Sequence, residues 1–151
     1  MIIKNLNQLD KIIKKIQSRI ENNSCIMLEG EIGVGKTTFT KKLINSFQTK
    51  EGVKRTAVLS PTYNLLYEYE IKKTKIKHYD LYRIEKLSEL SDLGILNDDE
   101  ECIKIIEWPK LVKNLFEDKL EINIYYEKIE NHRRFEIKGH GKWKNIKLNE
   151  L

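Results

Sequence analysis

The sequence predicts an α/β fold: a three-layer sandwich with a mixed, mostly parallel sheet and antiparallel hairpins. Three observations support this prediction. A short apolar run leads through a glycine-rich loop into a helical pattern, strands and helices alternate in the first part of the chain, and the last part contains alternating strands that form a meander. With 151 residues, two prolines, seven glycines and no repeat, residues 1–151 are expected to form a single domain.

An amphipathic helix is predicted near the N-terminus, because apolar residues recur there at helical spacing. Asn7 is the expected N-cap, and the helix is expected to end near Asn22 and Asn23. The next apolar run, Cys25–Leu28, is short and continuous, which is typical of a strand buried on both faces in a parallel sheet. The apolar positions of the helix are Leu6, Leu9, Ile12, Ile13, Ile16 and Ile20.

The loop after this strand, Gly30–Thr37, matches the phosphate-binding pattern G-x-x-x-x-G-K-[ST] in full. Its glycines allow a tight turn in which backbone N–H groups form an anion nest at the start of the following helix. Lys36 would reach the β- and γ-phosphates, and the Thr37 hydroxyl would bind Mg²⁺. The loop predicts a P-loop NTPase-like fold, with nucleotide contacts expected from Gly30, Glu31, Ile32, Gly33, Val34, Gly35, Lys36, Thr37 and Thr38.

Apolar residues at helical spacing predict that a helix follows the loop directly, with Phe39, Leu43, Ile44 and Phe47 on its buried face. Two β-rich runs, Tyr63–Glu70 and Lys75–Leu81, then predict a hairpin. Leu87, Leu90 and Leu93 predict a short helix that stops at Gly94.

Ile103–Ile106 is predicted to be another buried strand, which ends at Glu107. Pro109 cannot extend this strand but can open a helix, so a helix carrying Val112 and Phe116 is expected there. Alternation predicts two final strands, 121–126 and 133–137, followed by an apolar stretch that includes Trp143, Ile146 and Leu148.

Two carboxylates are placed to complete a phosphate-loop site. Asp80 and Glu107 each end a predicted strand, and the carboxyl ends of parallel strands meet where phosphates, Mg²⁺ and the attacking water must lie. Either carboxylate could bind Mg²⁺ while the other orients water as general base. The sequence leaves these two roles open, so Lys36, Asp80 and Glu107 are the catalytic candidates and Thr37, Glu107 and Asp80 the metal candidates.

Two further polar residues lie near these positions in the sequence. Thr62, within Ser60-Pro61-Thr62-Tyr63, is a candidate sensor of the γ-phosphate, although Ser-Pro also favours a plain turn. His78 is expected to be an edge-strand side chain rather than an active-site residue.

The composition is basic, with 28 Lys+Arg against 23 Asp+Glu, a net charge of +5 and a pI of about 9.0. Acidic residues gather in 85–101 and basic residues in 128–147. The sequence shows neither a signal peptide nor a membrane-spanning stretch, so a cytoplasmic protein is expected. Cys25 and Cys102 form no C-x-x-C motif and are expected to be buried, reduced thiols.

Four motifs together resemble the TsaE family, once called YjeE. They are the loop and its next residue, Gly30–Thr38, then Ser60–Tyr63, His78–Arg83 and Glu107–Pro109, in the family's order and at comparable spacing. The resemblance covers most of the chain. It implies an ATPase that uses ATP and Mg²⁺, hydrolyses ATP slowly alone, and acts with the TsaB–TsaD pair in forming threonylcarbamoyladenosine on tRNA.

The resemblance also implies that Asp80, Glu107 and Thr37 serve metal binding and hydrolysis, that Trp108 lies close to the nucleotide, and that Arg133 matches an arginine of the family's C-terminal part. Transfer RNA would be reached through the complex. Two alternatives remain open: a small-molecule or nucleoside kinase, and a non-catalytic nucleotide-dependent binding module or RNA-binding protein that uses the basic tail.

Overall fold

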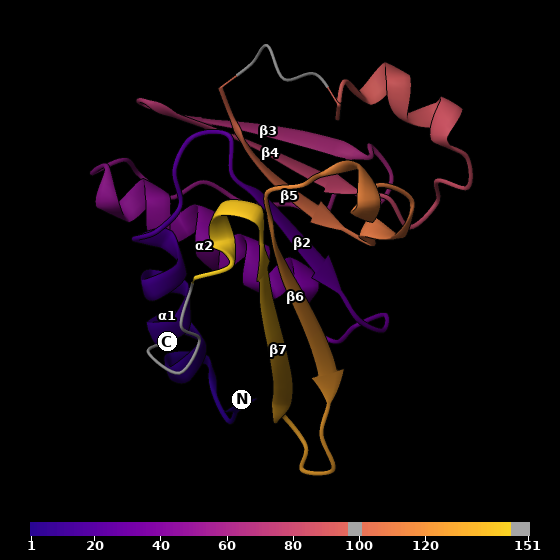
Figure 1. Cartoon of the computed structure of the whole chain (residues 1–151). Coiled ribbons are helices and arrows are strands. Elements are labelled where there is room, and N and C mark those ends of the chain that lie inside the picture. The colour runs from indigo at the N-terminus through magenta and orange to yellow at the C-terminus, as the bar shows by residue number, and fades with distance from the viewer. Residues whose placement is uncertain (97–100, 146–151) are drawn as a thin grey trace.

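The computed structural model describes residues 1–96 and 101–145 and contains a seven-stranded mixed sheet (Figure 1). The strand order is β1-β7-β6-β2-β5-β4-β3. The central pairs, β6 with β2, β2 with β5 and β5 with β4, are parallel, whereas the outer pairs are antiparallel. The strands are β1 Ile2–Ile3, β2 Cys25–Glu29, β3 Leu66–Ile71, β4 Thr74–Asp80, β5 Ile103–Glu107, β6 Lys119–Tyr126 and β7 Arg133–His140.

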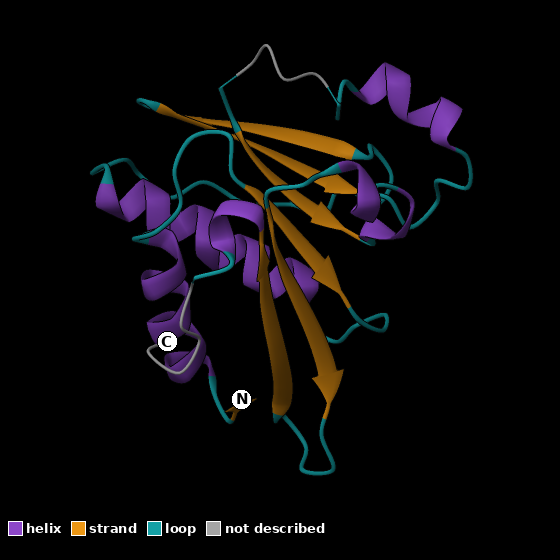
Figure 2. Cartoon of the chain, in the orientation of Figure 1, coloured by secondary structure: helices purple, strands orange, loops and turns teal. Residues whose placement is uncertain are grey.

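Both faces of the central strands are covered, which confirms the α/β prediction (Figure 2). Helices α1 (Leu6–Gln17) and α2 (Lys36–Lys50) cover one face, onto which β2 points Ile26 and Leu28. On the other face, Cys25 and Met27 of β2 pack with residues of short 3₁₀ segments. These segments are η1 (Leu87–Leu93) and η2 (Pro109–Leu111); η3 (Lys113–Leu115) follows them and buries no residue, so the third layer is thinner than the helical one.

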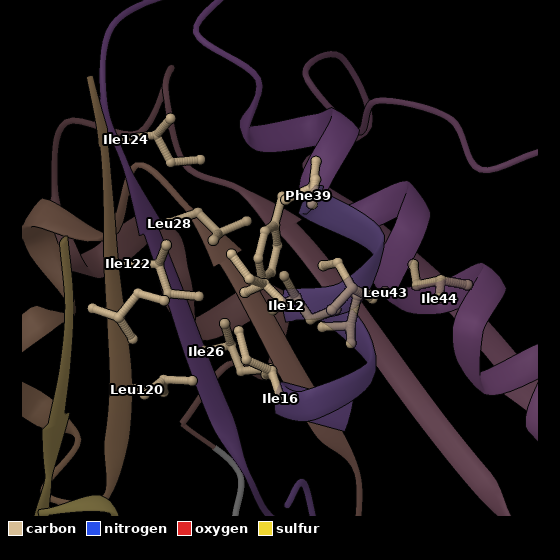
Figure 3. Packing of buried hydrophobic residues seen from close by; sticks show 14 of the residues in the cluster. Ile12, Ile16, Ile26, Leu28, Phe39, Leu43, Ile44, Leu120, Ile122 and Ile124 are labelled. Carbon is tan, nitrogen blue, oxygen red and sulfur yellow. The ribbon is translucent and has the colours of Figure 1, made fainter. Parts of the chain in front are cut away.

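The core under the helices fixes the position of α2. Phe39 and Leu43 of α2 are fully buried against Leu28 and Ile122 of the sheet, with Ile12 of α1 alongside (Figure 3). Burying a side chain of this size stabilises the fold by about 1.5–3 kcal/mol. The packing therefore holds the start of α2 over the carboxyl ends of the central parallel strands.

The first helix differs from its predicted limits at both ends. Asn5, not Asn7, is the N-cap, because its side chain accepts a hydrogen bond from the Gln8 backbone N–H at 3.0 Å while Gln8 Oε1 accepts one from Lys4 N at 2.7 Å. The helix ends at Gln17 rather than near Asn22 and Asn23. The residues after it turn toward β2, and Asn23 N bonds the Cys102 carbonyl.

Several other elements also differ from the prediction. The segment after Pro109 forms two 3₁₀ turns rather than one helix, and the hairpin begins at Leu66 rather than at Tyr63. Strand β1 was not predicted, because two residues carry no periodicity; it pairs with β7. Trp143 is buried at the end of the 3₁₀ turn η4 (Gly141–Trp143). The predicted apolar positions Ile146 and Leu148 lie outside the described residues, as do acidic residues 98–100.

Both cysteines are buried and unpaired by a disulfide, as the sequence predicts. Within residues 1–96 and 101–145, neither α1 nor α2 has the length and apolar character that a membrane crossing requires.

Candidate functional site

The candidate site lies where the central strands end beside the start of α2. Register places Asp80 of β4 opposite Glu107 of β5, and Glu107 opposite Leu28 of β2. The glycine-rich loop leaves β2 at this edge, so the predicted carboxylates and the loop meet. They enclose a cavity of about 280 Å³ lined by Ile32, Gly33, Gly35, Lys36, Thr37, Thr38, Thr62, Asp80, Tyr82, Glu107 and Trp108.

The loop conformation depends on its glycines at two positions. A Cβ on Gly30 would lie 2.3 Å from the Ile124 carbonyl oxygen, so no side chain fits between the loop and β6. Gly35 has a φ of 119° and caps α2 without any side-chain hydrogen bond, and the first turn contains no acidic residue. The first N–H groups of α2 lack intrahelical partners, so the positive end of the helix faces the cavity and favours an anion there.

Lys36 brings a second positive charge to the same place. Its ammonium group donates to the carbonyls of Gly30 and Glu31 at 2.7 and 2.9 Å and lies 3.8 Å from the centre of the Trp108 ring. It forms no ion pair within 4 Å among the described residues. Burial lowers the pKa of Lys36, and the negative charges of Glu107 and Asp80 partly oppose this shift. A buried ammonium group held only by carbonyls and a ring is well placed to receive an anionic ligand.

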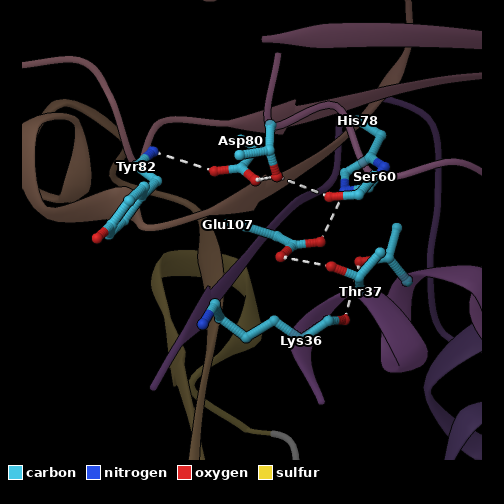
Figure 4. A network of polar contacts seen from close by, with 9 residues as sticks. Lys36, Thr37, Ser60, His78, Asp80, Tyr82 and Glu107 are labelled. Atoms are coloured by element: carbon cyan, nitrogen blue, oxygen red, sulfur yellow. Dashed lines mark hydrogen bonds and ion pairs between the residues drawn. The ribbon is translucent and has the colours of Figure 1, made fainter. Parts of the chain in front are cut away.

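Thr37 and Glu107 are joined directly. The Thr37 hydroxyl donates to Glu107 Oε2 at 3.0 Å, and the other oxygen, Oε1, lies 2.8 Å from His78 Nε2 (Figure 4). Glu107 is 2% exposed, so both oxygens depend on these neighbours for their hydrogen bonds. A hydroxyl and a carboxylate side by side form a hard oxygen donor pair of the kind that binds Mg²⁺.

Asp80 and Thr62 form a second pair on the opposite wall. The Thr62 hydroxyl donates to Asp80 Oδ2 at 2.6 Å, and Ser60 Oγ lies 2.8 Å from Thr62 Oγ1. The backbone N–H of Tyr82 donates to Asp80 Oδ1 at 3.0 Å, which fixes the carboxylate (Figure 4). The Ser-Pro-Thr segment, far from Asp80 in sequence, is thus connected to the strand-end carboxylate.

The interpretation of His78 as an edge-strand side chain is wrong. Strand β4 lies between β3 and β5, and His78 is fully buried. Because a carboxylate only accepts hydrogen bonds, Nε2 carries the proton in the contact with Glu107. His78 therefore holds Glu107 in the orientation that leaves Oε2 facing Thr37.

If this site hydrolyses ATP with Mg²⁺, as the resemblance in the sequence implies, replacing His78 with leucine should raise the Mg²⁺ concentration for half-maximal ATP turnover by about tenfold, because Glu107 loses a hydrogen bond worth about 1.5 kcal/mol. The ATP KM at saturating Mg²⁺ should change little. His78→Gln, whose amide can donate in place of Nε2, should recover much of the Mg²⁺ dependence. Equal behaviour of the leucine and glutamine variants, measured in folded protein, would show that the hydrogen bond does not orient Glu107.

Two aromatic residues complete the cavity. Trp108 adopts a left-handed conformation with φ 58° and ψ 55°, which is uncommon for a bulky residue and often accompanies a functional site. The Tyr82 ring lies 4.9 Å from the Trp108 ring and lines the same wall. The family resemblance placed Trp108 near the site but not Tyr82, whose signals were its position two residues after Asp80 and its place within the motif His78–Arg83.

Arg133 and Tyr126 support the loop from the side of β6 and β7. Arg133 Nε donates to the Val34 carbonyl at 3.0 Å, and the Tyr126 hydroxyl donates to the Ile32 carbonyl at 2.9 Å. The guanidinium of Arg133 lies 4.5 Å from the centre of the Tyr126 ring. Tyr126 was not predicted as a site residue, because nothing in an alternating strand shows which neighbour a side chain meets.

A second cavity of about 470 Å³ adjoins the first across the loop. The two share Gly33, Gly35 and Thr38, and together they form a two-part depression around the loop. The second cavity is lined by Ile3, Lys4, Asn5, Leu6, Leu9, Gly33, Val34, Gly35, Thr38, Asn131, Arg133 and Phe135.

The structure brings most of the predicted site residues to these two cavities. Gly30 and Glu31 lie behind the loop, where their carbonyls contact Lys36. Over residues 1–96 and 101–145, no group of three His, Cys, Asp or Glu side chains could hold a metal ion by itself. A hydroxyl and two carboxylates therefore fit a metal that takes its remaining ligands from water and phosphate, as Mg²⁺ does.

This fold and this loop define a P-loop protein, in which a glycine-rich loop between a parallel strand and a helix forms an anion site. The chain belongs to the TsaE family: the family model described as "Threonylcarbamoyl adenosine biosynthesis protein TsaE" matches residues 3–135. The resemblance found in the sequence motifs is thereby confirmed.

Curated relatives agree with this assignment, and a solved structure shows the same fold. Two relatives, both named tRNA threonylcarbamoyladenosine biosynthesis protein TsaE, come from Aquifex aeolicus and Rickettsia felis. The first is 36% identical over 122 residues (76% of this chain, 86% of the relative), and the second is 32% identical over 125 residues (82% and 71%). The crystal structure of Bacillus subtilis YdiB has the same fold, with a TM-score of 0.69 at 22% identity, over 94% of this chain and 85% of that one.

Proposed function

We propose that this protein is a Mg²⁺-dependent ATPase that acts with the TsaB–TsaD pair in forming threonylcarbamoyladenosine on tRNA. The observation that carries the proposal is the uncapped start of α2, with the Lys36 ammonium group beside it and the Thr37–Glu107 pair one residue further along. A positive helix end, a lysine and a hard-oxygen pair are the parts that a nucleoside triphosphate with Mg²⁺ requires.

We expect the Thr37–Glu107 pair and the Asp80–Thr62 pair to have different roles. Thr37 and Glu107 would hold Mg²⁺, since they already form one oxygen pair at the start of the phosphate helix. Asp80, with its carboxylate fixed by Tyr82 N–H and bonded by Thr62, would orient the attacking water. Bound Mg²⁺ would neutralise charge developing on the phosphates. The second cavity would receive the nucleoside, beside Arg133 and the start of α1.

Partner-dependent hydrolysis fits the site better than a kinase reaction. Arg133 donates a hydrogen bond to the Val34 carbonyl of the loop, and Arg83, three residues after Asp80, lies 4.4 Å from the centre of the Tyr63 ring. A kinase needs an arginine that can close over its acceptor substrate, whereas both of these arginines already contact other residues of this chain. The relatives are named for a tRNA modification, which supports the proposal that this chain acts in the cytoplasm.

The mouth of the cavity offers a surface for the partner. Ile32 and Tyr82 line the cavity and are 66% and 51% exposed, and Tyr63, next to the lining residue Thr62, is 81% exposed. These three side chains form an exposed rim of large apolar groups, of the kind that marks protein–protein contact sites. We expect this exposed rim to contact TsaB–TsaD.

Phosphate release from ATP should be slow for the isolated protein and rise at least tenfold with purified TsaB–TsaD. Tyr63→Ala should remove most of this stimulation and leave ATP affinity in the isolated protein unchanged, because Tyr63 does not line the cavity. Tyr125→Ala, which removes an exposed tyrosine from β6, is the matched control and should behave as wild type. A hydrolysis rate that does not change when TsaB–TsaD is added would contradict partner-dependent hydrolysis and favour the kinase alternative.

A further inference from the structure

A third concavity lies along the helical layer, on surface that the nucleotide does not need. It is a groove of about 640 Å³ between α1 and α2, larger than either cavity at the loop. The end marked by Asp10 and Lys42 lies nearest the loop, and the groove continues to the C-terminal ends of both helices. Its lining is Asp10, Ile13, Lys14, Gln17, Lys42, Asn45, Ser46, Thr49, Lys50 and Arg55.

The groove is strongly cationic. Lys42 pairs with Asp10 at 2.6 Å, and within residues 1–96 and 101–145 Asp10 is the only acidic residue in the lining. Lys14, Lys50 and Arg55 are exposed and have no carboxylate within 4 Å among the described residues. Lys14 and Lys50 lie in the last turns of α1 and α2, where they complement the helix dipoles. Arg55 lies beyond α2, so this role does not explain it.

A cationic groove can bind a polyanion, either an acidic protein or a nucleic acid, and the other lining residues favour one of these. Protein partners are usually held by aromatic and other apolar anchors, yet among the described residues Ile13 is the only apolar one that lines this groove, and no aromatic one does. Cations interleaved with amide and hydroxyl groups, here Gln17, Asn45, Ser46 and Thr49, are instead the groups that contact phosphates and sugars. Lys14, Lys42 and Lys50 lie on two packed helices, which fixes the backbone spacing of these three charges.

We propose that this groove binds the sugar-phosphate backbone of RNA. Neutralising phosphates releases condensed counterions, so binding should weaken steeply with salt and show little sequence preference. The inference is independent of nucleotide hydrolysis, because none of the groove residues lines the loop cavities. It also differs from binding through the basic segment 128–147, whose described residues lie largely on β7 and the turn before it.

The test uses the full chain without nucleotide and a fluorescent tRNA transcript, with anisotropy titrations from 50 to 200 mM KCl. The groove variant Lys14→Gln, Lys50→Gln, Arg55→Gln should bind at least about tenfold more weakly at 50 mM KCl, and the salt slope should fall by about two to three. The control Lys73→Gln, Lys128→Gln, Lys138→Gln removes the same charge from exposed sites elsewhere and should retain wild-type affinity and slope.

Three outcomes would overturn the inference. The wild-type protein could fail to bind the tRNA transcript at 50 mM KCl, both triple variants could lose tRNA affinity equally, or only the control variant could lose it. Tighter binding of poly-glutamate than of tRNA would also overturn it, since the groove would then fit an acidic protein. Lys36→Ala should bind tRNA as wild type does, and the groove variant should keep wild-type ATP hydrolysis. If the ATPase proposal fails, the RNA-binding measurements can therefore still be interpreted.

Discussion

Replacing Lys36 with alanine is expected to weaken ATP binding by about a hundredfold and to reduce hydrolysis to background. The ammonium group would exchange its two carbonyl contacts for phosphate oxygens, and losing charge-assisted hydrogen bonds of this kind costs about 3 kcal/mol. Catalysis suffers further, because the same charge stabilises the phosphoryl group in the transition state.

Binding of a fluorescent ATP analogue and phosphate release would both be measured. Lys36→Met serves as a second variant, because it keeps an apolar stem against Trp108 and lacks only the charge. Lys41→Ala removes the same charge from an exposed position in the next turns of α2 and should leave both quantities unchanged. Thermal unfolding would check the fold. Normal hydrolysis in a folded Lys36 variant would refute the assignment of the loop.

The second large effect is expected from the two carboxylates. Glu107→Gln should raise the Mg²⁺ concentration for half-maximal turnover by about tenfold or more, because one metal ligand loses its charge while its contacts with Thr37 and His78 remain possible. Asp80→Asn should lower kcat by about a hundredfold and leave ATP affinity nearly unchanged, as the loss of a group that orients water would.

Mg²⁺ titrations of turnover and of nucleotide binding distinguish the two roles. Glu29→Gln is the control: this carboxylate ends the neighbouring strand β2 but lies outside the cavity and pairs with Lys113. If Asp80→Asn shifts the Mg²⁺ dependence and Glu107→Gln does not, the two carboxylates exchange roles. Unchanged Mg²⁺ dependence in both variants would exclude the pair from metal binding.

The site could be predicted largely because its residues end strands. Asp80 follows a β-rich run and Glu107 a mostly apolar one, and parallel strands bring their carboxyl ends to one edge whatever the details of packing. The loop is equally local: its glycines, Lys36 and Thr37 are adjacent in sequence, so one motif specifies the anion site. Backbone geometry over a few residues determined both features.

Three features depended on tertiary structure. The motif that contains His78 was visible, but only the placement of β4 between β3 and β5 buries this side chain against Glu107. Tyr126 reaches the Ile32 carbonyl because β6 passes beside the loop, across 94 positions of sequence. The cationic groove requires α1 and α2 to lie side by side, which their separate periodicities do not specify.

By itself, the sequence determined the α/β class, the phosphate loop, the two strand-end carboxylates and the family, since each depends on local order or on motifs in fixed succession. Only the tertiary structure decided the strand order, the partner of His78, the bracing of the loop by Arg133 and Tyr126, and the groove between the helices. These depend on contacts between distant segments, and hydrophobic periodicity shows which face of an element is buried but not which element covers it.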